Sequence, residues 1–188
     1  MRQILDRIKI VFFTVMAVVL IPISINCQDK GGDVNQAFKK NQEGLNALQK
    51  DPAQAVKFFR EAQALDPKNP DFTNNVGVAF LTMGKCQEAI PYFVRATELD
   101  SKYVRGFYNE GVCYQNLQKN EEAVRAYKKA LNLTEVPEIH FNLGIVYTRL
   151  NDKKKAIEHY QKFITVAPAG MEQPVSDAKE KIKILSQN

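Results

Sequence analysis

Small and aromatic residues recur at a fixed interval along most of this chain. Four alanines stand 33 or 34 positions apart, and an aromatic residue follows each of them four positions later. Three glycines share the spacing, and each has an aromatic residue three positions after it. The main sets are Ala55, Ala89, Ala123 and Ala156; Phe59, Phe93, Tyr127 and Tyr160; and Gly77, Gly111 and Gly144. A period near 34 residues predicts stacked helix–turn–helix units, and therefore an all-α solenoid.

The interval divides residues 36–168 into four units and leaves one segment after them. The units cover about residues 36–69, 70–103, 104–136 and 137–169. The remaining stretch, 170–188, has the pattern of an amphipathic helix with lysines opposite an apolar face of Val175, Ala178, Ile182 and Leu185. Because a stack of repeats exposes the apolar face of its last unit, we expect this helix to be a C-terminal cap.

The first unit departs from the pattern. Gly44 precedes Ala55 by 11 positions, where the later units have 12, and Ala47 stands where an aromatic residue is expected. These departures predict a looser first helix.

With these residues in register, residues 36–168 resemble the tetratricopeptide repeat (TPR) family. The physical basis of the pattern is clear. A small residue is needed where two helices of one unit approach closely, and an aromatic residue one turn away fills the space between units. In such solenoids the first helix of each unit lines a concave surface that binds ligands. The resemblance therefore implies a protein or peptide binder and not an enzyme.

Polar residues occupy the position two before each glycine, namely Gln42, Asn75, Asn109 and Asn142. An asparagine side chain carries donors and an acceptor, so it can bond the backbone of an extended peptide whatever the peptide's sequence. A similar asparagine ladder grips peptide backbones in TPR proteins, and the resemblance makes Asn75, Asn109 and Asn142 the leading partner-binding residues, with Gln42 as a further candidate. Neighbouring candidates are Asn74, Tyr108 and Phe141, with Arg105 and Arg149 available to an acidic group. The alternative is that the asparagines simply face water.

The carboxylate clamp of chaperone-binding TPR domains, made of two Asn, two Lys and one Arg, is not reproduced. On units one to three its positions hold Asn41, Leu45, Asn75, Arg105 and Asn109. On units two to four they hold Asn74, Val78, Asn109, Glu138 and Asn142. Neither reading contains the two lysines, so this sub-type is set aside.

The first 26 residues have the layout of an export signal, because a short basic stretch leads into about seventeen uncharged, mostly apolar residues. Cys27 follows and resembles the lipidated cysteine of bacterial lipoproteins, although Ser24 and Asn26 replace the usual Leu and Gly or Ala. We expect a signal peptide at 1–26 and a lipidated Cys27 with a flexible linker at 27–35. The chain as a whole then resembles exported bacterial TPR lipoproteins, and the protein would be an exported, membrane-anchored lipoprotein of the periplasm or outer membrane. The alternatives are an uncleaved N-terminal anchor and cleavage that releases a free protein.

Residues that catalysis or metal binding requires are not grouped in the sequence. The two histidines, His140 and His159, lie 19 residues apart on different helices and are expected at the surface. Cys86 and Cys113 are expected to be small core residues, with a disulfide as the alternative. The net charge of +5 is spread over short basic runs and forms no stripe of the kind that nucleic-acid binders use. We therefore expect no enzyme activity, no cofactor, no metal and no nucleic-acid partner.

Two functions remain open. The first is an adaptor or scaffold of the bacterial cell envelope that binds an extended peptide or partner protein in the concave groove. The second is a structural or self-associating surface-exposed protein without a peptide groove. An adaptor keeps its groove open, whereas a self-associating protein buries a convex or end surface between copies.

Overall fold

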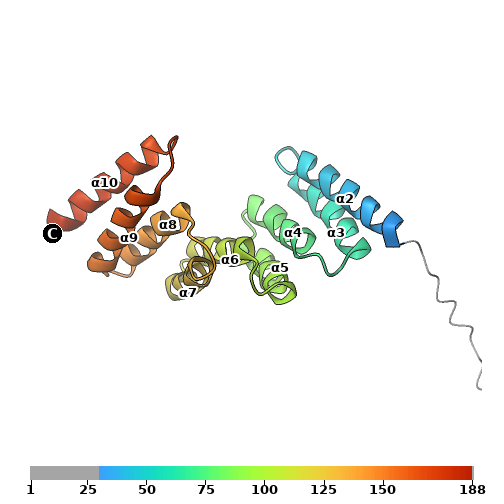
Figure 1. The fold of residues 1–188 in the computed structure, drawn as a ribbon, viewed down its shortest axis with the longest axis horizontal. Coiled ribbons are helices and arrows are strands. Elements are labelled where there is room, and N and C mark those ends of the chain that lie inside the picture. The colour runs from blue at the N-terminus through green and yellow to red at the C-terminus, as the bar shows by residue number, and fades with distance from the viewer. Residues whose placement is uncertain (1–29, 188) are drawn as a thin grey trace, which may run out of the picture. The chain divides into compact units, whose positions relative to one another are not determined.

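The computed structural model describes residues 30–187, which form nine α-helices that follow one another in chain order (Figure 1). They are α2 (Lys30–Ala47), α3 (Pro52–Leu65), α4 (Pro70–Thr82), α5 (Cys86–Leu99), α6 (Val104–Asn116), α7 (Asn120–Leu131), α8 (Pro137–Arg149), α9 (Lys153–Val166) and α10 (Glu172–Gln187). Within this range there is no strand, and no helix is long and apolar enough to cross a membrane. The predicted all-α solenoid is therefore confirmed. The expected signal segment 1–26 and Cys27 lie outside the described residues.

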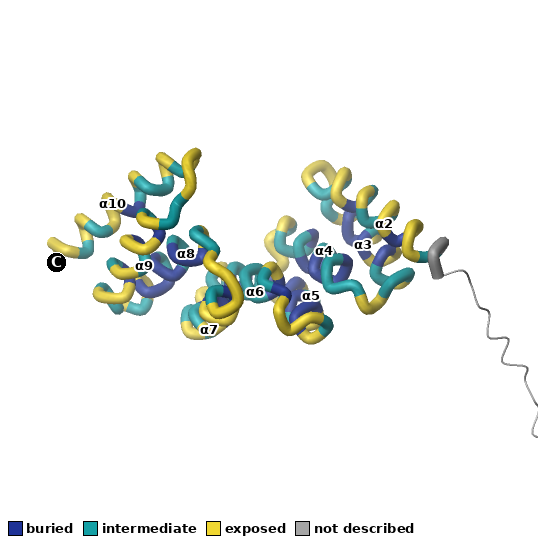
Figure 2. Tube along the Cα trace, viewed as in Figure 1, coloured by how far each residue is buried: buried dark blue, intermediate teal, exposed yellow. Residues whose placement is uncertain are grey.

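Neighbouring helices pack in sequence. The pairs α4–α5, α6–α7 and α8–α9 have the most extensive contacts, and each pair also contacts the next helix along the chain. Helix α10 packs on α9, where Ala178 is fully buried and Val175, Ile182 and Leu185 contact the same core cluster. In Figure 2 the buried segments lie where adjacent helices meet, and the turns are exposed. The predicted capping role of the last helix is confirmed.

In each helix pair, a glycine on the first helix packs against an aromatic ring on the second helix. A Cβ atom added to it would lie 2.5 or 2.6 Å from a ring carbon of the second helix, in the pairs Gly44–Phe59, Gly77–Phe93, Gly111–Tyr127 and Gly144–Tyr160. All four rings are buried, with at most 1% of their surface exposed. Since carbon atoms pack at about 3.5–4.0 Å, only a hydrogen atom fits at these positions. The glycine and aromatic periods in the sequence are therefore the two sides of one contact.

The turn inside the second, third and fourth pairs has one backbone conformation. Gly84, Gln118 and Asn151 each stand seven residues after the pair's glycine and have φ of 73°, 58° and 58°. In each case the next backbone N–H donates to the carbonyl five residues earlier at 2.9 Å. This is the Schellman arrangement, which satisfies the last carbonyls of the first helix and reverses the chain.

The first pair lacks this turn. Helix α2 ends three residues after Gly44, whereas α4 ends five residues after Gly77. Gly44 nevertheless makes the same close contact with Phe59 as the later glycines make with their rings. The first unit is therefore one residue shorter than the others between its glycine and its alanine, and the missing residue falls in the turn. The expectation of a looser first helix does not hold at its glycine, because the contact lies before the shortened segment.

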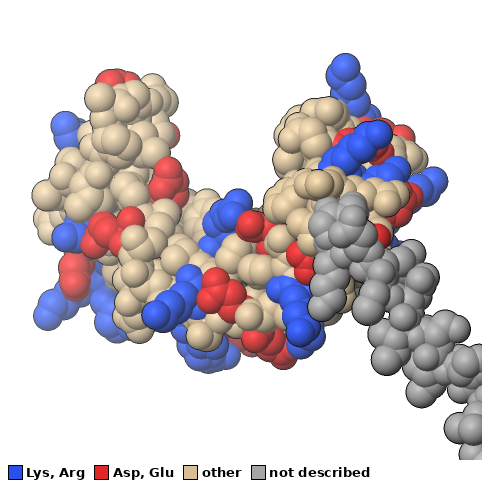
Figure 3. All heavy atoms as spheres, turned by 45° about the vertical axis from the view of Figure 1, so that its right-hand side comes forward, with Lys and Arg blue, Asp and Glu red and all other residues tan. Residues whose placement is uncertain are grey.

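Basic and acidic side chains are intermixed on the face shown in Figure 3. Exposed ion pairs include Arg95 with Glu98 at 3.0 Å, and Lys40 bridges to Glu61 at 2.9 Å. Ion pairs that water screens in this way contribute little to stability, so they tune the surface and do not hold the fold. On this face the positive charge is not gathered into a stripe.

Replacing Gly144 by alanine is expected to destabilise the fold by about 2 kcal/mol. Alanine favours a helix over glycine by about 1 kcal/mol. The added methyl group would meet three carbons of the Tyr160 ring within 2.7 Å, which places the overpacking cost near the upper end of its usual range, about 3 kcal/mol. Urea unfolding followed by circular dichroism measures the difference.

The matched control is Lys154→Ala on an exposed position of α9, which should change stability by less than about 0.5 kcal/mol. A Gly144→Ala variant as stable as the wild type would show that the ring moves aside and that the close contact does not require glycine.

Candidate functional site

Side-chain amides join the first helices of successive pairs. The asparagine two positions before a glycine donates its amide to the residue three positions before the glycine of the preceding unit. Asn75 Nδ2 lies 2.7 Å from Asn41 Oδ1, and Asn109 Nδ2 lies 2.9 Å from Asn74 Oδ1. We refer to Asn75, Asn109 and Asn142 as the amide ladder.

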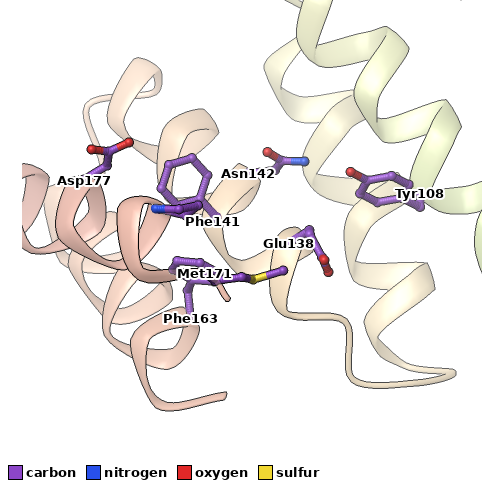
Figure 4. Close-up of a pocket in the computed structure, with 8 residues that line it drawn as sticks. Tyr108, Glu138, Phe141, Asn142, Phe163, Met171 and Asp177 are labelled. Carbon is purple, nitrogen blue, oxygen red and sulfur yellow. The ribbon is translucent and has the colours of Figure 1, made fainter. Parts of the chain in front are cut away.

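The third member of the amide ladder faces a hydroxyl group at the corresponding position. Figure 4 shows the Asn142 amide and the Tyr108 hydroxyl of the preceding unit pointing toward each other. Burial raises the pKa of Tyr108 above its usual value. Tyr108 is therefore a neutral phenol, with an oxygen that can accept a hydrogen bond and an O–H that can donate one.

Each member of the amide ladder keeps hydrogen-bonding capacity for a ligand. An asparagine side chain has two N–H donors and an oxygen with two lone pairs, and the contact with the preceding unit takes only one N–H. The three asparagines are half-buried. The ladder is thus fixed in position by the fold and still presents donors and acceptors.

Gln42 does not belong to this arrangement. Its unit is the first among the described residues, and its side chain is exposed, with Nε2 donating to Asn46 Oδ1 of the same helix at 3.2 Å. The sequence register places Gln42 with the asparagines, but the structure does not fix its side chain in the same way.

A pocket of about 250 Å³ lies at the end of the amide ladder, where α6, α8, α9 and α10 come together (Figure 4). Its lining comprises Tyr108, Glu138, Phe141, Asn142, Phe163, Met171, Pro174 and Asp177. The ring of Phe141 stands edge-on to the ring of Phe163, with centroids 5.2 Å apart. The structure therefore brings three of the predicted residues, Tyr108, Phe141 and Asn142, to one concave site. That site combines aromatic surface with polar groups, as ligand pockets commonly do.

The pocket also contains residues that the sequence did not single out as binding residues. Met171, Pro174 and Asp177 belong to the segment expected only to cap the solenoid, and Phe163 belongs to the core pattern. No repeat register points to them, because the cap is not a repeat. The sequence spacing could have predicted Glu138, because it stands four residues before Asn142 and so lies on the same face of the helix.

The two predicted anion-binding arginines are engaged by the protein itself. Arg105 forms an ion pair with Asp71, which also accepts a hydrogen bond from the Tyr103 hydroxyl at 2.6 Å. Arg149 donates to the backbone carbonyl of Gln115 at 2.9 Å. These contacts link neighbouring units and occupy part of the capacity that an acidic ligand would need.

Cys86 and Cys113 lie in the core, as expected, and are unbridged in this structure. Burial and the neighbouring Cys86 thiol raise the pKa of Cys113 above its usual value. A thiol with a raised pKa holds little of the reactive thiolate at neutral pH, so the contact indicates a packing role.

The expectation of surface histidines is wrong for His140. Only 7% of its surface is exposed, and its Nδ1 lies 2.9 Å from Nδ1 of His159 on the facing helix. The His159 ring also stacks on Tyr147, with centroids 5.4 Å apart. The signal was present, since His140 stands four residues before Gly144 and shares its buried face. Within residues 30–187 no group of three or more His, Cys, Asp or Glu is placed to hold a metal.

The family is shown by comparison with protein-family models. Models described as tetratricopeptide repeat match residues 72–103, 104–135 and 137–169. The chain therefore belongs to the tetratricopeptide repeat family. Domains of this family mediate protein–protein interactions, and the family is a scaffold family that is typically non-catalytic. A comparison with curated protein sequences gives no significant match.

Solved structures show the same fold at low sequence identity. PilF of Pseudomonas aeruginosa is 24% identical with a TM-score of 0.69, over 83% of this chain and 74% of its own. MamA of Desulfovibrio magneticus RS-1 is 18% identical with a TM-score of 0.68, over 81% of this chain and 90% of its own. The first TPR of Spaghetti (RPAP3), bound to the HSP90 peptide SRMEEVD, is 23% identical with a TM-score of 0.61, over 63% and 95%. At these identities the likeness establishes the fold alone.

Removing a member of the amide ladder is expected to destabilise the solenoid. Asn109→Ala leaves the Asn74 oxygen, whose residue is only 2% exposed, without its donor. An unsatisfied buried acceptor costs about 1–3 kcal/mol. Chemical unfolding should show this loss, whereas the exposed Gln42→Ala should be near neutral. Equal effects of the two substitutions would argue against the inter-unit role of the ladder.

The histidine pair predicts a stability that depends on pH. Burial and the neighbouring His140 lower the pKa of His159 from 6.5 to about 4. Between these two values the unfolded chain binds more protons than the folded chain, so stability falls as pH falls from 6.5 toward 4. Unfolding midpoints measured across this range should drop less steeply for His159→Gln than for the wild type. Parallel curves would show that His159 does not carry the effect.

Proposed function

We propose that this protein is an adaptor that binds an extended segment of a partner protein along the amide ladder and its terminal pocket. The observation that carries the proposal is the ladder itself. Its amides recur at the spacing of the units, are held by the preceding unit, and retain donors and acceptors for a peptide backbone. Fixed groups of this kind lower the ordering cost of binding.

Peptide binding in this fold supports the proposal, because the Spaghetti TPR has the same fold and is bound to a peptide. The partner of this chain should nevertheless differ in its chemistry. The clamp lysines are missing here, and Arg105 is paired with Asp71. A terminal carboxylate would therefore find little free positive charge at these positions.

The test begins with selection of a random heptapeptide library on the purified full chain. An enriched peptide is then titrated against Asn109→Asp/Asn142→Asp. Each aspartate keeps the shape of asparagine but loses both N–H donors, while Asn74 and Tyr108 can donate to it and preserve the contact between units. We expect peptide affinity to fall about 5- to 150-fold, because two hydrogen bonds of about 0.5–1.5 kcal/mol each are removed.

The control carries the same charge change at two exposed positions, Asn35→Asp and Asn132→Asp, and should bind as the wild type does. Failure to enrich any peptide would contradict the proposal, and so would equal loss of affinity in the ladder variant and the control. Concentration-dependent self-association without peptide binding would instead favour the structural alternative.

We also propose that the protein acts at the cell envelope, exported and anchored by a lipid on Cys27. The support is the basic start, the uncharged apolar run and the cysteine that follows it. These features do not depend on the solenoid.

Intact mass of the membrane-fraction protein is the measurement that tests this location. We expect a chain that begins at Cys27 and is heavier by a diacylglycerol and an acyl group, and we expect Cys27→Ala to lack this species. An unprocessed mass would mean an N-terminal anchor, and a shortened but unmodified mass a released protein; either result would contradict lipidation.

A further inference from the structure

The pocket at the end of the amide ladder is negatively charged. Two of its eight lining residues, Glu138 and Asp177, carry carboxylates, and none is basic. Neither carboxylate forms an ion pair within the described part of the chain. Gln173 donates to Asp177 at 2.9 Å, and this neutral contact leaves the charge in place. The carboxylate of Asp71, by contrast, already forms an ion pair with Arg105.

The space between the two carboxylates is apolar. Phe141, Phe163, Met171 and Pro174 supply hydrocarbon surface, and Figure 4 shows Phe141 and Met171 lying between Asp177 and Glu138. Helices α8 and α10 each contribute one of the acidic residues, so the assembled pocket exists only because the cap packs against the last repeat.

We infer that this pocket binds a lysine or arginine side chain of the partner segment, with the aliphatic stem on the aromatic and methionine surface and the cationic group at Glu138 or Asp177. The inference rests on the proposed function, because Asn142 belongs to both the amide ladder and the pocket lining. A backbone held by Asn142 therefore carries one of its side chains to the pocket.

The chemistry distinguishes this occupant from others. A long cationic side chain buries its methylene groups on apolar surface and keeps its charge at the rim. An acidic side chain would meet two like charges. A purely apolar side chain would cover the hydrocarbon surface but would partly dehydrate the carboxylates without compensating them. The aromatic rings add an attraction for a cation that neither of the other classes has.

The experiment compares peptide selections on three full-length proteins: the wild type, Glu138→Lys/Asp177→Lys, and the matched control Glu121→Lys/Glu180→Lys at exposed positions. The wild type and the control should enrich lysine and arginine at one peptide position. The reversed variant should enrich aspartate and glutamate there. Circular dichroism and unfolding midpoints establish that each variant folds.

Affinities then test the charge contribution without reversing it. For a selected peptide, Glu138→Gln/Asp177→Asn should weaken binding up to about fivefold, as expected when the exposed charge contact with either carboxylate is lost. High salt should reduce the wild-type affinity toward that of the neutral variant. This isosteric variant keeps the inference testable if the charge-reversed protein does not fold.

The outcomes separate this inference from the proposed function. Peptides that depend on Asn109 and Asn142 but show no lysine or arginine preference would overturn the inference and leave the adaptor proposal standing. A preference that persists in the reversed variant would also overturn it, because another site would then read the charge. If no peptide is enriched on any of the three proteins, both proposals fail.

Discussion

The close contact between a glycine and an aromatic ring is the constraint on which the rest of this structure depends. In all four helix pairs a ring carbon lies 2.5 or 2.6 Å from the place where a Cβ would stand, so the ring of the second helix packs directly on the backbone of the first. This packing fixes each pair as one unit, and the units then stack only with their neighbours. The first pair shows that the contact takes precedence over the connection, because its turn is shortened while the Gly44–Phe59 contact is kept.

Stacking at this distance brings the first helices close enough for their side chains to bond. Asn75 and Asn109 each use one N–H to join the preceding unit and keep further hydrogen-bonding capacity. In the proposed function, stability and binding would therefore be coupled in the same residues. A ligand that bonds several members of the ladder spans several units, and a solenoid whose units contact only their neighbours gains cohesion from such a ligand.

The charge along the amide ladder and its terminal pocket depends on which side chains are paired, and not on the net charge of the chain. The chain is basic overall, yet Arg105 is paired with Asp71 and Arg149 with a backbone carbonyl. At the other end of the ladder two carboxylates lack a counter-ion among residues 30–187. The site where a partner is proposed to bind is thus acidic within a basic protein, which is why net charge alone gives a misleading picture of the partner.

The sequence by itself determined the fold class, because a solenoid of stacked helix pairs follows from a periodic requirement for small and aromatic residues. The amphipathic pattern of the last segment predicted the capping helix. The sequence also identified Asn75, Asn109 and Asn142, since they share one register position. The tertiary structure alone decided what these side chains contact, that Gln42 stands apart from them, and that His140 is buried against His159. It also decided the pocket, because Met171, Pro174 and Asp177 reach Phe141 only through the packing of α10 on α9. A period describes what every unit shares, whereas that pocket forms where the repetition ends.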